Sequence, residues 1–270
     1  MRSVLVTGSS RGFGRLIAVA LACRGRRVFA TMRDPAAGRD LLQQGVRVLR
    51  LDVDDPDSVT EAVGEVLAET DGRLSAAVLN AGIASGGAFE DVPDDEFERV
   101  LRTNFFGTLR VARAVLPALR AHGDGRLLVM SSDSGMYGTP GLSAYTASKF
   151  AVEGWAESIA LEVAGFGVHV TILEPGNFKT DIWDTQPIRV EGSPYARLTG
   201  RLTTMAGKIA ESAGDPALVA QVTVKALEAD RPRLRYRIGA DARLMHAARR
   251  LLPDRARLGL IRRYAKLDAR

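Results

Sequence analysis

Short apolar runs alternate with longer amphipathic segments along most of the chain. The apolar runs lie at residues 4–6, 28–30, 46–51, 76–79, 127–130 and 168–173. Strands that are apolar on both faces are typical of a parallel sheet that helices cover on both sides. The segments between them that have helical periodicity lie at residues 14–24, 58–69, 97–119 and 143–163. This alternation predicts an α/β fold, a doubly wound parallel sheet with helices on both faces.

Proline and acidic residues mark where several helices begin. Asp55–Pro56, Pro93–Asp94 and Asp215–Pro216 each place a capping side chain or a first-turn proline at a helix start. After Gly176 the alternation fades, and residues 181–212 read as a long loop with a helical patch at 202–211. A last edge strand is expected at 234–238. Residues 240–270 read as a helical extension of two Arg-rich helices broken at Pro253, so we expect a single domain over 1–270.

Composition and charge narrow the class of protein. Hydrophobic residues make up 46% and charged residues 26% of the chain, as in ordinary globular proteins. The net charge of +5 comes mostly from arginines near the end of the chain, so we expect a solvated face there and no nucleic-acid or membrane partner. Cys23, the single cysteine, is expected to be a small core residue, and an intrachain disulfide is impossible. With no expected signal peptide or membrane span, this suggests a cytoplasmic protein.

A glycine-rich turn joins the first strand to the first helix. Gly8, Gly12 and Gly14 occur in Thr7-Gly-Ser-Ser-Arg-Gly-Phe-Gly, the segment that also contains Ser10, Arg11 and Phe13. Such a turn directs backbone N–H groups and the positive end of a helix dipole at a pyrophosphate. A tight structural turn that needs positive φ is the alternative. The context between strand and helix favours dinucleotide binding on a Rossmann-type sheet.

The end of the second strand bears on which dinucleotide is bound. An acidic residue there would accept a hydrogen bond from the adenosine ribose and select NAD(H). Met32 occupies that position and Arg33 follows it, while Arg11 lies in the glycine turn. Two guanidinium groups suit a 2′-phosphate, so the sequence predicts NADP(H) over NAD(H). The alternative for Arg33 is a solvated residue paired with Asp34.

Tyr145 and Lys149 are candidates for acid–base chemistry. Their spacing of four residues places them on one face of a helix, where an ammonium would lower the pKa of the phenol. A surface tyrosine beside a solvated lysine is the alternative. Ser132 ends the fifth strand, 13 residues before Tyr145. Ser131 and Ser134 compete with it as the reactive serine.

Taken together, these motifs resemble those of the short-chain dehydrogenase/reductase family. The resemblance rests on TGxxxGxG at residues 7–14, Asn80-Ala81-Gly82 with Leu79 in place of a first Asn, Ser131-Ser132, YxxxK at 145–149, and PGxxxT at 175–180. The stretch AYTASKFAVEGWAESIALE at 144–162 is most similar to the retinol and 17β-hydroxysteroid dehydrogenase-like branch.

The resemblance implies a catalytic tetrad of Asn104, Ser132, Tyr145 and Lys149. Tyr145 would be the general acid or base, and Ser132 would hold the substrate oxygen. Lys149 would lower the pKa of the tyrosine and contact the nicotinamide ribose. Asn104, in an NxxG motif, would hold a water that links the lysine to solvent. Asp133, beside Ser132, is assigned no chemistry and is expected to cap a helix or face solvent.

The resemblance also implies the residues that contact the cofactor. Asp52 would accept from the adenine amino group, unless it only starts the following helix, and Thr180 would lie by the carboxamide. The full set is Gly8, Ser10, Arg11, Gly12, Phe13, Gly14, Arg33, Asp52, Val53, Asn80, Ala81, Gly82, Tyr145, Lys149, Pro175, Gly176, Phe178 and Thr180. No metal site is expected, because the three histidines are scattered.

The implied function is an NADP(H)-dependent oxidoreductase that interconverts a ketone or aldehyde and an alcohol by hydride transfer. The branch suggests a small-molecule substrate that is bulky and apolar. Residues 181–212 would form the substrate lid, with Ile182, Trp183 and Ile188 as apolar contacts. Ser134, Met136 and Tyr137 would line the opposite side.

The two long helical segments, 97–119 and 143–163, imply a homodimer or homotetramer. Two other functions stay open. A non-catalytic NAD(P)H-binding sensor on the same fold is one, although the complete tetrad argues against it. An NAD(P)-dependent epimerase or dehydratase is the other, although its relatives space the glycines as TGxxGxxG.

Overall fold

The computed structural model describes residues 2–264, and only the backbone of Trp183, Asp184 and Tyr264. In this part of the chain seven parallel strands form one sheet in the order β3-β2-β1-β4-β5-β6-β7. The strands are β1 (Ser3–Thr7), β2 (Arg27–Met32), β3 (Arg47–Arg50), β4 (Leu74–Leu79), β5 (Gly125–Met130), β6 (Val168–Pro175) and β7 (Arg235–Ile238). The predicted fold class is confirmed, including β7 as an edge strand.

The order of the strands reverses between β1 and β4. From β1 the chain winds outward to β3, then returns to β4 on the other side of β1 and winds outward to β7. The connections on the two sides of this point diverge, so a crevice opens beyond the carboxyl ends of β1 and β4. Binding sites in open α/β sheets form at this crevice.

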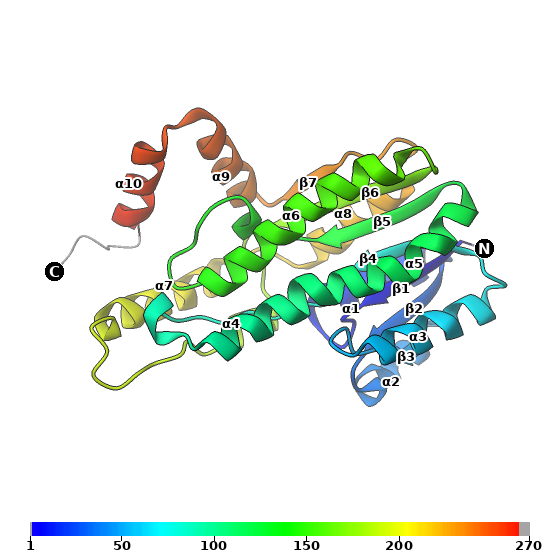
Figure 1. Cartoon of the computed structure of the whole chain (residues 1–270), viewed down its shortest axis with the longest axis horizontal. Helices are drawn as coiled ribbons and strands as arrows, with labels where there is room; N and C mark the ends of the chain where they lie inside the picture. The colour runs from blue at the N-terminus through cyan, green and yellow to red at the C-terminus, as the bar shows by residue number, and fades with distance from the viewer. Residues whose placement is uncertain (1, 265–270) are drawn as a thin grey trace.

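Helices cover both faces of the sheet (Figure 1). One layer contains α3 (Pro56–Glu69), α5 (Thr108–His122) and α6 (Ser143–Ala164), and its core includes Leu5, Phe29, Val111 and Val152. The other contains α1 (Gly12–Cys23), the short α2 (Arg39–Leu42) and α8 (Ala217–Glu228), and its core includes Val4, Ile17, Leu41 and Val219. Because successive side chains of a strand point to opposite faces, Val4 and Leu5 belong to different cores.

The predicted helix starts occur where capping side chains lie. The Asp55 carboxylate accepts hydrogen bonds from the backbone N–H groups of Asp57 (3.0 Å) and Ser58 (3.3 Å), and Pro56 is in the first turn of α3. Asp215 accepts from the N–H of Ala217 (2.9 Å) at the start of α8. These bonds satisfy N–H groups that a helix leaves without internal partners.

The long helical segment predicted at 97–119 differs from the prediction. It begins as α4 (Asp94–Leu101), widens into a π-helical turn (Arg102–Gly107) and continues as α5 to His122. A side chain at Gly107 would come within 2.8 Å of Val53, so this glycine lets the loop after β3 approach the turn. Single π turns inside α-helices are frequent at functional sites, and this one contains Asn104.

Three further differences concern short or peripheral features. The four-residue α2 was not predicted, because one turn carries no periodicity. The predicted patch at 202–211 is part of a longer helix, α7 (Ala196–Ser212). Cys23, the last residue of α1, is exposed, so the expectation that it is a core residue is wrong.

The chain after β7 is helical, as predicted. It forms α9 (Ala240–Leu251) and α10 (Asp254–Tyr264), with Pro253 between them; residues 265–270 of the predicted extension lie outside the described residues. Among the described residues, no helix is both long enough and apolar enough to cross a bilayer.

Candidate active site

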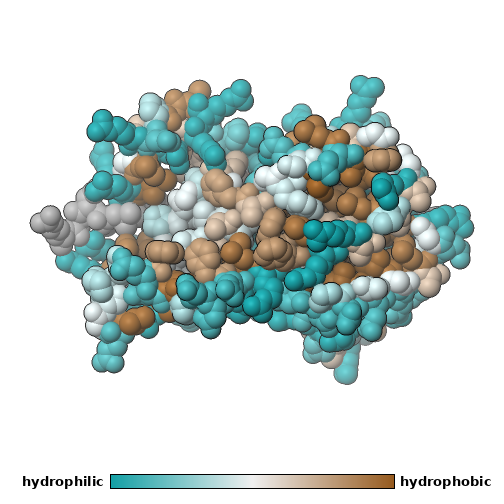
Figure 2. Space-filling model, in the orientation of Figure 1, coloured by the Kyte–Doolittle hydropathy of each residue, from teal (hydrophilic) through white to brown (hydrophobic). Residues whose placement is uncertain are grey.

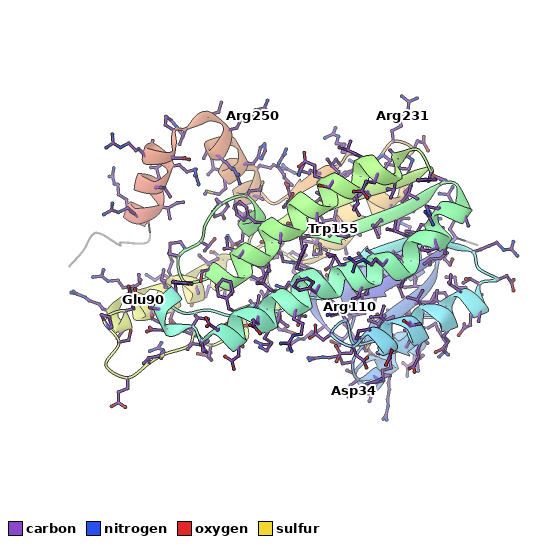
Figure 3. All side chains as sticks on the ribbon, viewed as in Figure 1. Asp34, Glu90, Arg110, Trp155, Arg231 and Arg250 are labelled. Carbon is purple, nitrogen blue, oxygen red and sulfur yellow. The ribbon has the colours of Figure 1, made fainter. Side chains whose placement is uncertain are left out.

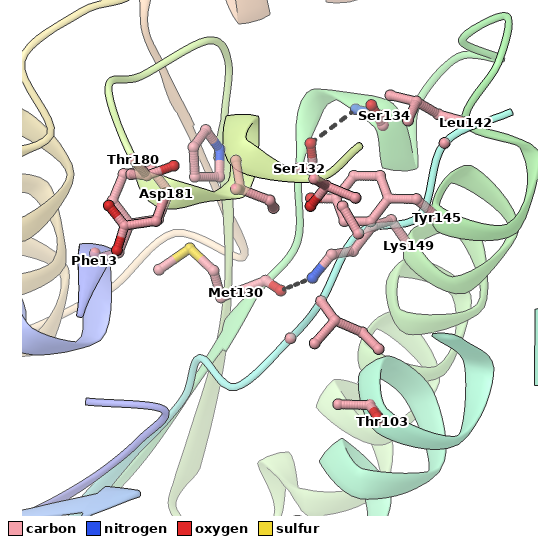
Figure 4. Close-up of a pocket in the computed structure, with 18 of the residues that line it drawn as sticks. Phe13, Thr103, Met130, Ser132, Ser134, Leu142, Tyr145, Lys149, Thr180 and Asp181 are labelled. Atoms are coloured by element: carbon pink, nitrogen blue, oxygen red, sulfur yellow. Dashed lines mark hydrogen bonds between the residues drawn. The ribbon is translucent and has the colours of Figure 1, made fainter. Parts of the chain in front are cut away.

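One cavity of about 880 Å³ lies at the carboxyl end of the sheet. Nearly every predicted site residue lines it. These residues are Gly8, Ser10, Arg11, Gly12, Phe13, Arg33, Asp52, Val53, Asn80, Ala81, Gly82, Ser132, Tyr145, Lys149, Pro175, Gly176, Phe178 and Thr180. Figure 4 shows that Phe13, Ser132, Tyr145 and Thr180, which come from distant parts of the chain, surround this space. Two predicted residues, Gly14 and Asn104, do not line it.

The glycine turn fits a pyrophosphate. Gly8 and Gly12 have φ of +68° and +58°, the left-handed region that glycine adopts without strain. Arg11, which precedes α1, makes no side-chain capping bond, and the first turn of α1 has no acidic residue. The first N–H groups of α1 therefore remain available for an anion.

Gly14 does not line the cavity and instead packs against Gly8 and Asn80. A side chain at Gly14 would come within 2.3 Å of the carbonyl oxygen of Gly8 and 2.5 Å of Nδ2 of Asn80. Asn80 Nδ2 donates to the carbonyls of Thr7 (3.0 Å) and Gly8 (3.1 Å). Gly14 thus allows close packing of α1 on the turn.

Thr7 is a residue whose role the sequence did not indicate. Its hydroxyl oxygen accepts hydrogen bonds from the N–H groups of Asn80 (2.9 Å) and Ala81 (3.1 Å). These bonds join the ends of β1 and β4 at the point where the sheet reverses. The threonine of the TGxxxGxG motif was visible in the sequence, but its partner is more than 70 residues away.

Two arginines lie at the end of the cavity near β2. Arg33 and Arg11 both line it, and Arg11 Nε is 3.5 Å from the carboxylate of Asp181. The alternative pairing of Arg33 with Asp34 is not observed among the described ion pairs. Asp34 instead accepts a hydrogen bond from the N–H of Ala36 (2.9 Å).

The wall beyond β3 contains Asp52 and residues that the sequence did not single out. Asp52 accepts from the N–H of Asp54 (3.0 Å), and its own N–H donates to Ser58 Oγ (3.0 Å). Asp54 in turn accepts from Thr103 Oγ1 (2.7 Å), and Asp54, Thr103 and Arg99 also line the cavity. Thr103 comes from the π turn, so this contact could only be found in three dimensions.

Ser132, Tyr145 and Lys149 meet where β5 ends beside α6. Ser132 follows β5, and Tyr145 and Lys149 lie one turn apart on α6. Lys149 is 4% exposed, and its Nζ donates to the carbonyl of Met130 (2.9 Å) and lies 5.6 Å from the centre of the Tyr145 ring. Ser131, the predicted rival, is also at the wall, but its buried hydroxyl has no hydrogen-bond partner.

The acid–base state of the pair differs from the prediction. Burial raises the pKa of Tyr145 to about 12, although a hydrogen bond with Ser132 opposes this shift, and the charge of Asp133 adds to it. Burial also lowers the pKa of Lys149 to about 8. The expectation of a lowered phenol pKa is therefore wrong for this structure, because loss of solvent disfavours the charged form of both groups.

Asn104 lies behind Lys149 and is 1% exposed. Its side-chain amide donates to the carbonyl of Ile83 (2.9 Å) and to Ser148 Oγ (2.9 Å), and its side-chain oxygen accepts from the N–H of Ile83 (2.8 Å). A side chain at Gly82 would lie 3.3 Å from Asn104 Oδ1 and 3.7 Å from Lys149 Nζ. Both amide hydrogens of Asn104 are occupied, so its side chain ties the π turn to the loop after β4.

Asp133 contradicts the expectation that it caps a helix or faces solvent. It is 6% exposed, and its carboxylate accepts from Ser132 Oγ (3.0 Å) and from the hydroxyl of Tyr137 (2.6 Å). Tyr137 and Met136 are not among the residues that line the cavity, so their predicted role there is wrong. Ser134 does line it, and its N–H donates to Ser132 Oγ (3.2 Å) (Figure 4).

The far end of the cavity is mostly apolar. It is formed by the loop before α6, by the segment around residue 185 and by α7, which contribute Thr139, Pro140, Gly141, Leu142, Thr185, Gln186, Pro187, Thr199, Leu202, Thr203, Met205, Ala206, Gly207, Ile209 and Ala210. None of these side chains is charged. Ile182 also lines the cavity, whereas Ile188 does not, and the Trp183 side chain lies outside the described part.

Comparison with known proteins identifies the family. The model of the family described as short chain dehydrogenase matches residues 2–189. The chain belongs to the short-chain dehydrogenase/reductase family. It is thus an enzyme of the oxidoreductase class that acts on CH–OH groups with NAD(P), and the resemblance stated from the sequence is confirmed.

Individual relatives resemble the chain over most of its length. The uncharacterized oxidoreductase YusZ of Bacillus subtilis is 36% identical over 92% of this chain and 93% of its own length. Human 17-beta-hydroxysteroid dehydrogenase type 1 is 36% identical over 86% of this chain and 76% of its own. A short-chain dehydrogenase structure from Streptomyces avermitilis superposes with a TM-score of 0.83 at 34% identity, covering 98% of this chain and 97% of the other.

Proposed function

We propose that this short-chain dehydrogenase/reductase is an NADP(H)-dependent enzyme that interconverts a bulky apolar ketone or aldehyde and its alcohol, with Tyr145 as the general acid or base. One observation carries the proposal. A single cavity joins the uncapped N-terminus of α1 to Ser132, Tyr145 and Lys149. A dinucleotide held by the glycine turn would therefore reach the phenol of Tyr145.

Different residues along the cavity would bind different parts of the dinucleotide. The N–H groups of the glycine turn would bind the pyrophosphate, and Asp52 with the backbone of Val53 would contact the adenine. The segment from Pro175 to Thr180 would bind the carboxamide, and Lys149 the nicotinamide ribose. When bound, the nicotinamide supplies or accepts the hydride.

Tyr145 and Ser132 would handle the oxygen of the substrate. In reduction, Tyr145 donates its hydroxyl proton to the carbonyl oxygen as the carbon gains hydride, and Ser132 holds that oxygen. A pKa of about 12 keeps the phenol protonated near neutral pH, which suits a proton donor. Asn104 would act as a positioning residue, since it fixes the π turn beside Lys149.

Arg33 and Arg11 support the preference for NADP(H). Both line the cavity near the end of β2. The buried Met32 occupies the position at which an acidic residue would select NAD(H). A 2′-phosphate dianion accepts charge-assisted hydrogen bonds from guanidinium groups, whereas a 2′-hydroxyl gains little from them. Asp181, which pairs with Arg11, would compete for that residue, so Arg33 is the main candidate.

The uncharged far end of the cavity supports an apolar substrate. Residues 181–212 would serve as the lid, in which α7 presents Leu202, Met205 and Ile209 to the space beside Tyr145. A charged substrate would lose its hydration there without gaining an ionic partner. The name of the human relative, a 17-beta-hydroxysteroid dehydrogenase, is consistent with a ketone of this size.

We further propose a homodimer or homotetramer that forms through the surface of α5 and α6. Figure 2, in the orientation of Figure 1, shows apolar residues gathered over this layer. Large side chains exposed on or next to it are Phe106, Phe150, Leu161 and Phe166. Exposed apolar groups of this size commonly mark an interface.

Tyr145→Phe tests the proposed function. The substitution removes the proton donor and keeps the ring, so kcat for NADPH-dependent ketone reduction should fall by about 10²–10⁴-fold. The assay follows nicotinamide absorbance with a panel of a 17-ketosteroid, retinal and an aliphatic ketone. NADPH binding, measured by calorimetry, should change little.

Tyr236→Phe is the matched control. Tyr236 lies on β7 outside the residues that line the cavity, and its hydroxyl accepts a hydrogen bond from the N–H of Arg233 (3.3 Å), so turnover should persist. Full turnover by Tyr145→Phe would contradict the mechanism. NADPH binding without turnover across the panel in the unmodified protein would favour a cofactor sensor. Turnover without net change of the nicotinamide would favour an epimerase.

A further inference from the structure

The carboxyl group of Asp133 lies in a hydrogen-bonded chain that ends at the reacting side chains. Tyr137 donates to one carboxylate oxygen (2.6 Å), and Ser132 donates to the other (3.0 Å). The Ser132 side chain in turn acts on Tyr145, whose pKa it lowers. Asp133 is 6% exposed, so these bonds are sheltered from exchange with bulk water. The proposed mechanism assigns Asp133 no part.

The Ser132 hydroxyl has one hydrogen, but Asp133 and the substrate oxygen would both accept it. A hydroxyl has one hydrogen to donate and two sites at which to accept. In this structure Ser132 donates to Asp133 and accepts from the N–H of Ser134 (3.2 Å), which leaves one site for the hydroxyl of Tyr145. A carbonyl oxygen only accepts. Ser132 therefore has no hydrogen for the substrate while it donates to Asp133.

Protonation of Asp133 removes the conflict. The carboxylic acid form donates its own hydrogen to Ser132 Oγ, while Tyr137 continues to donate to the other oxygen. Ser132 then accepts from Asp133 and from Ser134, and its hydrogen is free for the substrate oxygen. No heavy atom has to move, because the Asp133 and Ser132 oxygens are already within hydrogen-bond distance.

We propose that Asp133 is a positioning residue that sets the direction in which Ser132 donates its hydrogen. The carboxylate form withholds this hydrogen from the substrate, and the carboxylic acid form releases it to the carbonyl oxygen. Carbonyl reduction therefore slows as Asp133 ionises. The inference rests on the proposed function for its effect on turnover.

The surroundings of Asp133 raise its pKa above the ordinary value of an aspartate. Burial raises its pKa, and the negative charge of Asp241 on α9 raises it further, whereas the hydrogen bonds from Tyr137 and Ser132 lower it. Glu174 on β6 also interacts with Asp133. Its carboxylate is paired with Arg235 (3.3 Å) and Arg237 (3.2 Å), so the charge facing Asp133 is partly compensated.

Asp133→Asn is the first test, because an asparagine amide imitates the carboxylic acid form. Its nitrogen donates to Ser132 and its oxygen accepts from Tyr137 at every pH. In the unmodified enzyme, kcat/KM for reduction should decline by about tenfold per pH unit above the pKa of Asp133. In Asp133→Asn this decline should be absent, while the low-pH rate stays within about threefold and any decline from Lys149 remains.

Tyr137→Phe is the second test and shifts the same decline. Its loss removes a hydrogen bond that stabilises the carboxylate, so the pKa of Asp133 should rise and the decline should move to higher pH. Asp230→Asn, which changes an exposed carboxylate away from the cavity, should leave the profile unchanged. A rate lowered equally at all pH values in the Asp133 and Tyr137 variants would indicate a structural role and overturn the proposal.

Infrared difference spectroscopy gives a readout that needs neither substrate nor cofactor. The carbonyl stretch of protonated Asp133 should be missing in Asp133→Asn and should titrate at higher pH in Tyr137→Phe. Unmodified protein that reduces no ketone but shows this titration contradicts the proposed function and supports the coupling of Asp133 to Tyr137. Active protein in which Tyr137→Phe leaves the titration unmoved contradicts the inference alone.

Discussion

Tyr145 and Lys149 show how burial acts on single residues. Both side chains are buried, and burial favours the neutral form of each. It raises the pKa of Tyr145 to about 12 and lowers the pKa of Lys149 to about 8. Near neutral pH the phenol thus keeps its proton, and the lysine is close to its titration point. A protonated phenol can donate to a carbonyl oxygen, which is the role that carbonyl reduction requires of Tyr145.

Arg33→Asp tests the choice of cofactor at the residue scale. A guanidinium bound to a phosphate contributes about 1.5–3 kcal/mol, so Kd for NADPH should rise by about 10- to 150-fold while Kd for NADH changes little. Calorimetric titration measures both. Arg39→Asp, on the exposed side of α2 and outside the cavity, is the control. Unchanged NADPH affinity in Arg33→Asp would show that Arg33 does not bind the phosphate.

Glu174 predicts a pH dependence of stability. It is fully buried, and burial, followed by the charge of Glu153, raises its pKa to about 7 despite Arg237 and Arg235. Between its ordinary value of 4.5 and about 7, the folded state binds more protons than the unfolded chain. The Glu174 contribution to the free energy of unfolding therefore decreases as pH rises through this window, by about 3 kcal/mol at most.

Glu174→Gln measures that contribution. The variant cannot ionise at this position, so its free energy of unfolding should fall less between pH 4.5 and pH 8 than that of the unmodified protein. Urea unfolding at several pH values gives the difference. Glu211→Gln, at an exposed site, should follow the unmodified curve. Parallel curves for Glu174→Gln would show that the glutamate ionises normally.

At the scale of elements, the junction of β1 with α1 positions the cofactor end of the site. Here the turn, the end of β4 and the first residues of α1 approach so closely that only glycine fits at position 14. The π turn after α4 has a similar effect at the other end, because it brings Thr103 to Asp54 and Asn104 to Ser148.

Gly14→Ala should destabilise the fold through this junction. The added methyl group would meet the Gly8 carbonyl at 2.3 Å, so α1 must shift, at a cost of about 1–3 kcal/mol in the free energy of unfolding. NADPH affinity should fall as well, since the turn moves. Urea unfolding and calorimetry measure the two effects.

Gly64→Ala is the matched control for that experiment. Gly64 lies inside α3 with open space around it, and alanine favours a helix interior by about 0.5–1 kcal/mol. This variant should gain stability. A neutral effect of Gly14→Ala would show that the junction relaxes without strain.

At the scale of the whole molecule, the helix layer that contains α5 and α6 carries large apolar side chains that are exposed to solvent. Leu161 on α6 is 80% exposed and Phe166, just after this helix, is 57% exposed. Both lie on the layer of helices that faces the viewer in Figures 1 and 2. Association of two copies through this layer would remove them from water.

Leu161→Glu should weaken self-association. A carboxylate at the centre of an apolar contact would raise the dissociation constant by more than about tenfold, equivalent to about 1.4 kcal/mol. Sedimentation velocity over a range of protein concentrations measures the change. Leu244→Glu, at an exposed site on α9, is the control and should leave the constant unchanged. A monomer at all concentrations in the unmodified protein would contradict the proposed oligomer.

Local patterns determined most of the fold and the identity of the candidate residues. The strands, the glycine turn, the helix starts at Asp55 and Asp215 and the Tyr145–Lys149 pair each depend on neighbours within a few residues, so they can be read along the chain. Hydrophobic periodicity and capping are short-range effects. Their combination was sufficient to predict the sheet and the family.

Only the tertiary structure decided how these residues are buried and what they contact. The bonds of Thr7 to Asn80, the contact of Thr103 with Asp54 and the position of α7 across the cavity join segments far apart in sequence. The pKa of Tyr145 is raised, although the sequence predicted a lowered value, because desolvation depends on every element packed around a group. Sequence spacing can place two charges on one helix face, but it cannot measure how much water remains beside them.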